Sequence, residues 1–347
     1  MTLPSATAPA SAPPRVSTES TILLALEPGE LKMFLGEAPI IPGMSVFLED
    51  TRGLKKLPAG EWLERLDRGR PEILVSCWST PALPIDWITQ PNCPLRYICH
   101  LTGSVRQLVP RRFLENGGIV TNWGSCAARQ VAEHALLLTL SALRNSTDWR
   151  SLSIANKLLG TRTLFGQNVG IHGFGQVARA LLTLLRPFGV KASVHAPGVP
   201  DSLIRSHDAE PCSSLLELAA SCSVFIDCEA LTSESLGSVD REVLAALPDD
   251  AVFVNVGRGR VVDEAALIAE AISGRLRIAL DVVSEEPLDP NSPLATLPHV
   301  IHSPHLAGPT GDRLHSCGQH TLDNISRFLL GEPLTAVVDL ESYDRAT

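Results

Sequence analysis

The amino-acid sequence predicts an α/β protein built on two doubly wound parallel sheets. Three observations predict this fold class. Short apolar segments alternate with helical patterns twice along the chain, a glycine-rich turn joins a strand to a helix at 173–178, and polar residues follow three successive strands after residue 250. Strand–helix alternation is typical of parallel sheets covered by helices. The length of 347 residues suits two domains, because a single domain usually holds about 100–200 residues.

The amino-terminal segment and the net charge limit the classes of function. Residues 1–20 are rich in Pro, Ala, Ser and Thr, so we expect a disordered tail there. No apolar run reaches the length that would span a bilayer. The formal charge of -9 argues against nucleic acid and against an anionic membrane as partners, because both need a basic surface. An anionic small molecule needs only local positive charge and stays possible.

Eight cysteines are scattered along the chain, and no CxxC pair occurs among them. Their spacings fit neither a zinc site nor a small disulfide framework. We therefore expect free thiols, no metal, and a protein that works in a reducing cytoplasm.

The first alternation of strands and helices runs from Thr21 to Asn122. Helices are expected near 28–35, 59–67 and 109–116. Strands are expected at TILLAL (21–26), SVFL (45–48), EILVS (72–76), LRYIC (95–99) and GIVTN (118–122).

A long helix is expected next, from about Cys126 to Leu143. Its segment VAEHALLLTLSAL is apolar on nearly every side, which predicts a buried helix. The stretch centred on 146–163 has no strong period, so we expect a connector and a dimer arm there.

The second alternation starts at Gln167 and ends with a helix near 311–330 that stops at GEP. Helices are expected at QVARALLTLLR, SSLLELAA, DREVLAAL and DEAALIAEAI. Strands are expected at NVGIHGF, VKASV, SVFID, AVFVNV, RIALDVV and VIHS.

The glycine-rich turn has the spacing Gly173-x-Gly175-x-x-Ala178 between a strand and a helix. The first glycine permits a tight turn, the second lets a diphosphate approach the backbone, and the small third residue packs against the strand. The acid that usually ends the next strand and binds a ribose diol is absent, because Ala196 stands there. His195 could assist a phosphate or simply face solvent. NAD and NADP therefore both remain possible cofactors.

Arg258, Glu286 and His305 each follow a strand of the second alternation. The carboxyl ends of parallel strands line the binding crevice of such sheets, so we expect these three side chains to converge. Reduction of a 2-oxo acid needs a proton donor, and a histidine with its ordinary pKa of about 6.5 suits that task. A neighbouring carboxylate stabilises the protonated ring, and an arginine matches a carboxylate in shape and charge. Singly, each could be an ordinary loop residue; together, in a nucleotide-binding sheet, they predict a catalytic site.

These segments resemble the D-isomer-specific 2-hydroxyacid dehydrogenases from about Leu95 to Val338. The resemblance rests on VTNWGSCAARQVAEHALLL, LFGQNVGIHGFGQVA, VNVGRGRVVDEAAL, ALDVVSEEPL, SPHLAG and GEPLTAVV. It implies a hydride transfer between NAD(P)H and the 2-oxo carbon of a small 2-oxo acid, which gives a D-2-hydroxy acid. It also implies a homodimer.

The resemblance implies a flavodoxin-like substrate domain (21–125 and 307–340) and an inserted Rossmann cofactor domain (126–306), with a cleft between them. It places the family's catalytic arginine, glutamate and histidine on Arg258, Glu286 and His305. The cofactor residues it implies are Gly173, Gly175, Gln176, Val177, Val256, Gly257, Asp281 and Gly308. The substrate residues, in a loop that offers backbone N–H groups, are Thr102, Gly103, Ser104 and Val105.

The chain departs from the family pattern at three places. The substrate loop is TGSVRQLV where relatives resemble GVGVDNID, Ala196 replaces an acid, and Cys228-Glu229-Ala230 replaces His-x-Pro. The first departure leaves the substrate open, and the other two leave the choice of cofactor open. A nucleotide-binding regulatory or corepressor-like protein on the same fold is the alternative function.

Overall fold

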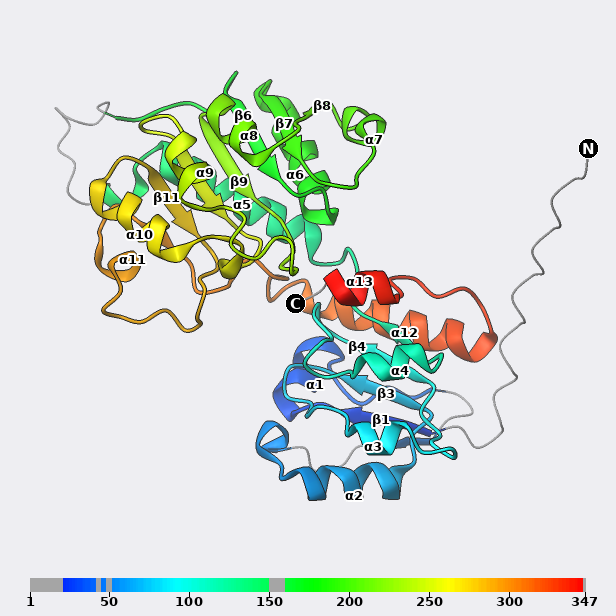
Figure 1. Ribbon diagram of the computed structural model, residues 1–347. Coiled ribbons are helices and arrows are strands. Elements are labelled where there is room, and N and C mark those ends of the chain that lie inside the picture. Colours follow the sequence, from blue (N-terminus) through cyan, green and yellow to red (C-terminus); the bar gives the residue numbers. More distant parts are fainter. Residues whose placement is uncertain (1–20, 42–44, 48–51, 150–159, 346–347) are drawn as a thin grey trace, which may run out of the picture. The chain divides into compact units, whose positions relative to one another are not determined.

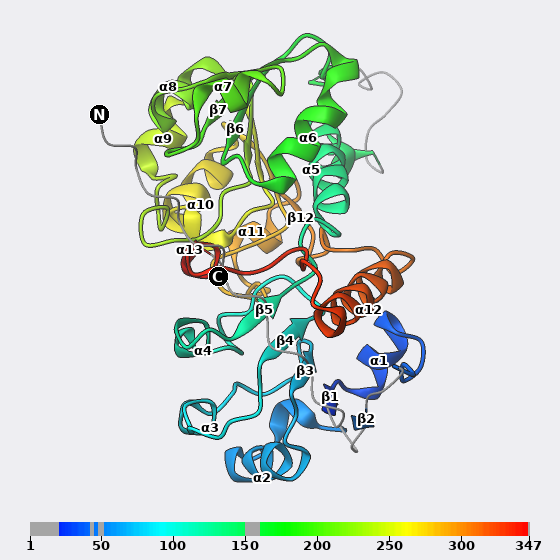
Figure 2. The same ribbon diagram turned by 90° about the vertical axis from the view of Figure 1, so that its right-hand side faces the viewer.

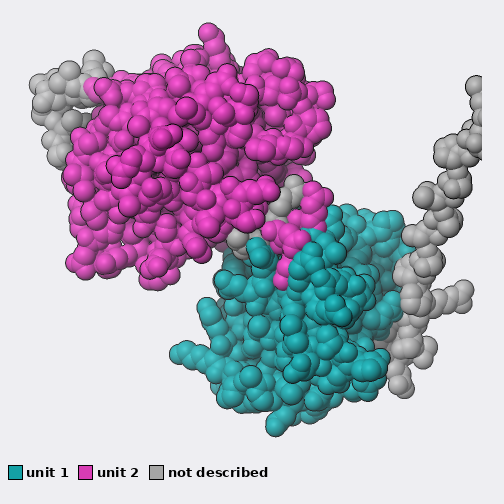
Figure 3. Space-filling view, viewed as in Figure 1, with its two compact units in different colours: residues 1–124, 314–340 teal, residues 125–313, 341–347 magenta. Residues whose placement is uncertain are grey.

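The computed structural model describes residues 21–41, 45–47, 52–149 and 160–345. The chain divides into two compact units, residues 1–124 with 314–340 and residues 125–313 with 341–347 (Figure 3). Each unit is built on one parallel sheet, so the predicted fold class is confirmed. The predicted tail and most of the predicted connector lie outside the described residues. The substrate and cofactor roles assigned to the two domains stay predictions.

The smaller unit has the strand order β2-β1-β3-β4-β5, which is the flavodoxin-like order. Its strands are β1 (Thr21–Ala25), β2 (Ser45–Phe47), β3 (Ile73–Ser76), β4 (Tyr97–His100) and β5 (Ile119–Thr121). Its helices are α1 (Pro28–Phe34), α2 (Ala59–Gly69), α3 (Ile85–Ile88), α4 (Arg111–Glu115) and α12 (Leu314–Leu330), with a 3-10 turn η1 (Leu54–Lys56). All five strands stand where the sequence predicts them, within two residues at each end.

Helix α12 completes the smaller unit although it comes almost 200 residues after β5. It lies so close to α1 that a Cβ on Gly318 would overlap the carbonyl oxygen of Phe34. Its Phe328 ring stacks on Tyr97 of β4 at 4.8 Å between centroids. The sheet is therefore covered by a helix from the far end of the chain.

The larger unit has the strand order β12-β11-β10-β9-β6-β7-β8, in which the chain reverses direction across the sheet at β6. This is the dinucleotide-binding order with one added strand. Its strands are β6 (Asn168–His172), β7 (Lys191–His195), β8 (Ala209–Pro211), β9 (Val224–Asp227), β10 (Val252–Asn255), β11 (Arg277–Leu280) and β12 (Ile301–His302).

The helices of the larger unit connect these strands (Figure 1). They are α5 (Ala128–Leu143), α6 (Gln176–Leu185), α7 (Asp201–Arg205), α8 (Leu215–Ser221), α9 (Arg241–Ala246), α10 (Glu264–Ser273) and α11 (Pro293–Thr296). Short 3-10 turns lie at η2 (Ser146–Asp148), η4 (Arg186–Phe188) and η5 (Gly259–Val261), and α13 (Leu340–Arg345) ends the described chain.

Two hydrophobic cores lie on opposite faces of the larger sheet. Successive strand residues point to opposite faces, so Val224 and Ile226 join the core under α5 and α6, while Phe225 joins the core under α8, α9 and α10. Figure 2 shows these two sets of helices on either side of the strands. Burial on both faces explains why β9 and β10 are apolar at almost every position.

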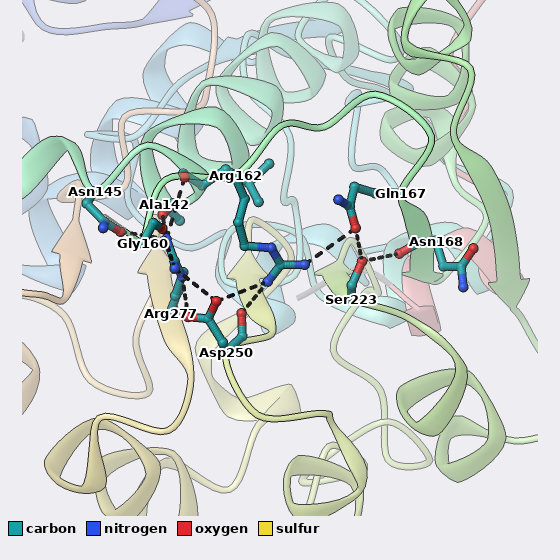
Figure 4. Close-up of polar contacts among 10 residues, drawn as sticks. Ala142, Asn145, Gly160, Arg162, Gln167, Asn168, Ser223, Asp250 and Arg277 are labelled. Atoms are coloured by element: carbon teal, nitrogen blue, oxygen red, sulfur yellow. Dashed lines mark hydrogen bonds and ion pairs between the residues drawn. The ribbon is translucent and has the colours of Figure 1, made fainter. Parts of the chain in front are cut away.

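The amino ends of the larger sheet are joined by a polar network (Figure 4). Arg277, the first residue of β11, contacts both carboxylate oxygens of Asp250 at 2.6 and 2.9 Å. The same guanidinium donates to Asn145 Oδ1 at 2.6 Å and to the carbonyl oxygen of Gly160 at 2.5 Å. Arg162 donates to the carbonyl oxygen of Asp250 at 2.5 Å. The network therefore fixes the chain on both sides of residues 150–159 to the sheet.

The structure departs from the sequence prediction in several elements. Strand β8 and helices α3, α7, α11 and α13 are not predicted. Strand β8 is three residues long and ends in Pro211, which is tolerated because the strand lies at the sheet edge. The prediction that α5 is buried all round is wrong, because Leu137 is 55 % exposed. The helix buries its alanine-rich face instead. Within the described residues, no helix combines the length and apolar character needed to cross a membrane.

Candidate active site

The glycine turn after β6 has the geometry that a bound dinucleotide requires. Gly173 has a φ of +91°, a backbone conformation that favours glycine. A Cβ at this position would lie 2.9 Å from Oε2 of Glu229 and 3.0 Å from its Cα. The turn and the loop after β9 are therefore in close contact, and a side chain on Gly173 would separate them.

The start of α6 leaves backbone N–H groups available for a diphosphate. Gly175 precedes the helix without a side-chain cap, and a Cβ there would meet nothing within 4 Å. Gln176 and Val177 form the first turn, and Ala178 is fully buried against the strands. Open space at the second glycine and a small third residue fit the nucleotide that the sequence predicts.

The loop after β10 positions Arg258 between two glycines. Buried Asn255 holds this loop, since its side chain accepts from the N–H of Gly257 at 2.9 Å and donates to the carbonyl oxygen of Arg258 at 3.1 Å. A Cβ on Gly259 would overlap the carbonyl group of Val283. The arginine loop is thus in backbone contact with the loop that follows β11.

The charge of Arg258 lies in a poorly hydrated place. Burial lowers the pKa of its guanidinium, and the negative charge of Glu286 acts in the opposite direction. Arginine stays protonated near neutrality in spite of such a shift. Its Nη1 donates to the carbonyl oxygen of Gly257 at 2.8 Å. A cation in this environment attracts an anion more strongly than a fully hydrated one would.

His305 and Glu286 form a pair. Nδ1 of His305 lies 2.7 Å from Oε2 of Glu286, and the two side chains are 49 % and 38 % exposed. The carboxylate accepts a hydrogen bond from Nδ1, so Nε2 is the nitrogen that can exchange a proton with a ligand. His305 has a φ of +55°, which is unusual for a residue with a side chain. The structure therefore brings together the three residues that the sequence singles out.

Asp281 holds the loop that carries His305. Its buried carboxylate accepts from Ser303 Oγ at 2.6 Å, from the N–H of Leu306 at 2.8 Å and from the N–H of Ala307 at 3.1 Å. Burial favours the protonated acid, but hydrogen bonds from His134, Ser303 and these amides outweigh it and lower the pKa of Asp281. In this structure, Asp281 positions the histidine loop. The nicotinamide contact that the resemblance implies for it stays a prediction.

Sequence reasoning missed two residues that support the site. His134 of α5 lies 3.4 Å from the Asp281 carboxylate. A histidine within an otherwise apolar helix is the sequence feature that could have identified it. Glu264 accepts from the N–H of Ser284 at 2.7 Å and so fixes the loop before Glu286. Asp263, the residue before Glu264, caps the amino end of α10. Both acids therefore have structural roles.

The other residues predicted for the cofactor lie in the same unit. Val256 is buried in the core beneath α5 and α6, so its side chain serves packing and leaves only its backbone for a ligand. Gly257 packs against the backbone of Glu229, because a Cβ on it would lie 2.6 Å from that carbonyl oxygen. Gly308 is half-buried, three residues after His305.

The predicted substrate loop lies in the smaller unit, beyond β4. Thr102 is buried and its hydroxyl lies 2.6 Å from Nε2 of His100, whose Nδ1 lies 2.9 Å from Ser76 Oγ. Burial lowers the pKa of His100 to about 4, so the ring is neutral at ordinary pH. The side chain of Thr102 is therefore committed to this chain of hydrogen bonds.

The rest of that loop is packed closely. A Cβ on Gly103 would lie 2.8 Å from Nε1 of Trp123, and Val105 is fully buried. Ser104 is half-buried, and its hydroxyl oxygen is inaccessible and makes no hydrogen bond to the described residues. Substrate binding by Thr102, Gly103, Ser104 and Val105 stays a prediction.

A cluster of titratable groups lies at the carboxyl ends of β6, β7 and β9. His172 Nδ1 lies 2.9 Å from Asp227 Oδ1, and both residues are buried. The His172 and His195 rings stack at 6.1 Å. His195 is half-buried and its Nδ1 lies 3.0 Å from the carbonyl oxygen of Cys212. Glu229 lies beside this cluster.

Comparisons with known proteins agree with this site. A sequence model described as "D-isomer specific 2-hydroxyacid dehydrogenase, NAD binding domain" matches residues 135–307. A glyoxylate/hydroxypyruvate reductase of Arabidopsis thaliana is 32% identical over 235 residues, which are 65% of this chain and 70% of the relative. A D-3-phosphoglycerate dehydrogenase of Methanocaldococcus jannaschii is 29% identical over 231 residues, which are 65% of this chain and 44% of that longer protein.

Solved structures share the whole fold. The TT0316 protein of Thermus thermophilus superposes with a TM-score of 0.72 at 23% identity and covers 92% of this chain and 99% of its own. An NADPH-dependent glyoxylate/hydroxypyruvate reductase of Sinorhizobium meliloti gives 0.70 at 24% identity, with 94% and 99% covered. The chain therefore belongs to the D-isomer-specific 2-hydroxyacid dehydrogenases, a family of NAD(P)-dependent oxidoreductases.

Proposed function

We propose that this protein reduces the 2-oxo group of a small 2-oxo acid to a D-2-hydroxy acid, with Arg258, Glu286 and His305 as the catalytic residues. The observation that carries the proposal is the 2.7 Å contact between His305 Nδ1 and Glu286, in loops adjoining that of Arg258. The glycine turn and the start of α6 would hold the diphosphate of NAD(P)H, whose reduced nicotinamide would supply the hydride. The names of the relatives, which are reductases and dehydrogenases, support the enzyme and offer no support for a regulatory protein.

Arg258 binds the carboxylate of the substrate and polarises its carbonyl group. Its guanidinium offers paired N–H donors that match a carboxylate. Partial burial strengthens this attraction, because the charge has fewer water molecules around it. The loop of Gly103, Ser104 and Val105, which Thr102 fixes, offers its backbone N–H groups to a substrate carboxylate.

His305 donates the proton that the new hydroxyl group needs. Glu286 accepts a hydrogen bond from Nδ1 and stabilises the imidazolium, so Nε2 presents the proton. In the reverse direction the neutral ring takes the proton back from the alcohol. Asp281 keeps this ring in place through the amides of Leu306 and Ala307.

A substrate panel tests the proposal. Glyoxylate, hydroxypyruvate, pyruvate and phenylpyruvate are each offered with NADH and with NADPH, and the loss of nicotinamide absorbance is followed. We expect turnover with at least one pair, and His305→Ala to lower kcat by about 10²–10⁴-fold because the proton donor is lost. The exposed His315 of α12 provides the control variant His315→Ala, which retains full activity. Near-normal turnover in His305→Ala would refute the assignment.

The enzyme acts as a homodimer that forms on α5. Support comes from large apolar side chains that are exposed on this helix and on the segments that follow it in the chain, since Leu137 is 55 % exposed, Trp149 64 % and Phe165 64 %. Where such side chains form a contiguous patch, the patch commonly marks an interaction site. Sedimentation equilibrium should give twice the mass of the chain, and a monomer would contradict this part of the proposal.

The protein works in a reducing compartment, for which the cytoplasm is our proposal. All eight cysteines are free in the structure, and four of them are buried. An oxidising compartment would favour disulfides in a chain with this many thiols. Detection of the tagged protein outside the cytoplasm would contradict this assignment.

A further inference from the structure

The strand that usually carries the ribose-binding acid does not carry one here. Strand β7 ends at His195 and is followed by Ala196 and Pro197. Ala196 is half-buried and packs against the core beneath α5 and α6. In dinucleotide-binding sheets an Asp or Glu near this place accepts hydrogen bonds from the adenosine ribose. That acid has to come from elsewhere, or the chain has none.

Glu229 lies where an acid from another strand could take over this task. It follows β9, which is the neighbour of β6 on the side opposite to β7. Its Oε2 is the atom nearest to a Cβ built on Gly173, at 2.9 Å, so the carboxylate stands over the first glycine of the turn. Its backbone is fixed from the other side by Gly257. The side chain therefore has a fixed position beside the phosphate-binding turn.

One oxygen of this carboxylate is available to a ligand. Oε1 accepts from the N–H of Ala230 at 3.0 Å, while Oε2 makes no hydrogen bond to the residues that the structure describes. Burial raises the pKa of Glu229, and the charge of His172 counteracts that rise. Asp227 and His195 are the other charged or titratable groups that act on it. A half-buried acid with an unpaired oxygen is costly unless a ligand pairs with it.

We propose that Glu229 binds the 2′- and 3′-hydroxyls of the adenosine ribose and thereby selects NAD over NADP. The proposal rests on the function proposed above and names the cofactor that this site takes. A carboxylate accepts hydrogen bonds from a diol, whereas it repels the 2′-phosphate of NADP. Residues 195–200 contain no lysine or arginine that could neutralise such a phosphate. Glu229 is then the residue that determines cofactor specificity.

Direct titration calorimetry of the purified protein tests this without any turnover. The ligands are NAD⁺, NADP⁺ and 2′-deoxy-NAD⁺, and the variants are Glu229→Gln and Glu229→Ala. We expect the wild type to bind NAD⁺ at least about tenfold more tightly than either analogue, because a hydrogen bond to a charged group is lost or a repulsion is gained. Glu229→Gln should reduce the NAD⁺ to NADP⁺ affinity ratio by about tenfold or more, since the amide keeps the shape but not the charge.

The analogue without the 2′-hydroxyl separates the hydrogen bond from the repulsion. In Glu229→Ala, NAD⁺ and 2′-deoxy-NAD⁺ should bind equally, because no carboxylate remains to accept from the hydroxyl. Glu234→Gln is the matched control, as this acid lies in the same loop and is exposed; it should leave all three affinities unchanged. A wild type that prefers NADP⁺, or a Glu229→Gln variant with an unchanged affinity ratio, would overturn the proposal. Neither result would affect the proposed chemistry, which is tested separately by the substrate panel and by the turnover of His305→Ala.

Discussion

The two edges of the seven-stranded sheet use polar residues in opposite ways. At the amino ends, Arg277 meets Asp250, Asn145 and the carbonyl oxygen of Gly160 within the unit (Figure 4). At the carboxyl ends, the pair of His305 and Glu286 is half exposed, and Glu229 keeps one oxygen without a hydrogen bond to the described residues. Polar groups satisfied by their own unit contribute stability, and polar groups left partly unsatisfied are available for a ligand. In this sheet, the polar network at the amino ends of the strands contributes to stability. The partly unsatisfied side chains at the carboxyl ends are available for a ligand.

The largest effect is expected on activity, from a substitution at the carboxyl ends of the strands. Arg258→Gln should lower kcat/KM for the 2-oxo acid by about 10²–10³-fold, because a preorganised cation is lost from the site. The free energy of unfolding should change little. Steady-state kinetics and urea unfolding measure the two quantities on the same sample.

Arg260 is the matched control for that substitution, because it is exposed and lies two residues further along the same loop. Arg260→Gln should keep the wild-type kcat/KM. If both variants lost activity equally, the effect would belong to the loop and not to the side chain of Arg258.

At the amino ends of the strands we expect a smaller effect, which is on stability and not on activity. Arg277→Gln should lower the free energy of unfolding by about 3 kcal/mol, since a mostly buried guanidinium loses several hydrogen bonds at once. Its kcat at 25 °C should not change. Arg186→Gln removes a comparable ion pair, with Asp208, whose two side chains are 53% and 71% exposed, and should cost less than about 0.5 kcal/mol. Loss of turnover in a folded Arg277→Gln protein would break the comparison between the edges.

The smallest effect is expected on the pH dependence of stability and concerns the smaller sheet. It shows that a polar residue at the carboxyl end of a strand can also serve stability when its own unit satisfies it. His100 ends β4, at a carboxyl edge, yet Ser76 and Thr102 satisfy both of its ring nitrogens. Burial lowers its pKa to about 4, so below its ordinary pKa the unfolded chain binds a proton that the folded unit does not. Stability present at neutral pH is therefore lost on acidification, by about 2 kcal/mol between pH 7.5 and pH 5. His100→Gln should lack this part of the pH dependence.

Urea unfolding followed by tryptophan fluorescence measures this dependence. Four of the five tryptophans, at positions 62, 78, 87 and 123, lie in the smaller unit. An equally steep loss of stability with falling pH in His100→Gln would assign the effect to other groups.

Most strands and helices, and the proximity of Arg258, Glu286 and His305, could be predicted from the sequence because both depend on local patterns. Apolar segments such as those of β9 and β10 are continuous since both faces of a parallel strand are buried. Arg258, Glu286 and His305 follow strands, and the geometry of a parallel sheet brings such positions together. Strand β8 was missed because three residues with a proline carry no such pattern.

Features that depend on contacts between distant segments could not be predicted. The exposed Leu137 of α5 has neighbours as apolar as itself, and only the packing of the folded unit decides which of them are covered. The sequence alone identifies Glu229 only as a departure from the family pattern. Its position over Gly173 depends on how closely two loops approach, and no spacing in the sequence encodes that distance.

The backbone contact between Gly259 and Val283 has a consequence for engineering. Because Glu264 also accepts a hydrogen bond from the N–H of Ser284, the arginine loop and the loop before Glu286 are held in a fixed position relative to each other. Transplanting either loop alone into a related enzyme should misalign the cation relative to the acid. Redesign of substrate choice should therefore leave residues 255–286 intact and vary the TGSVRQLV segment of the other unit.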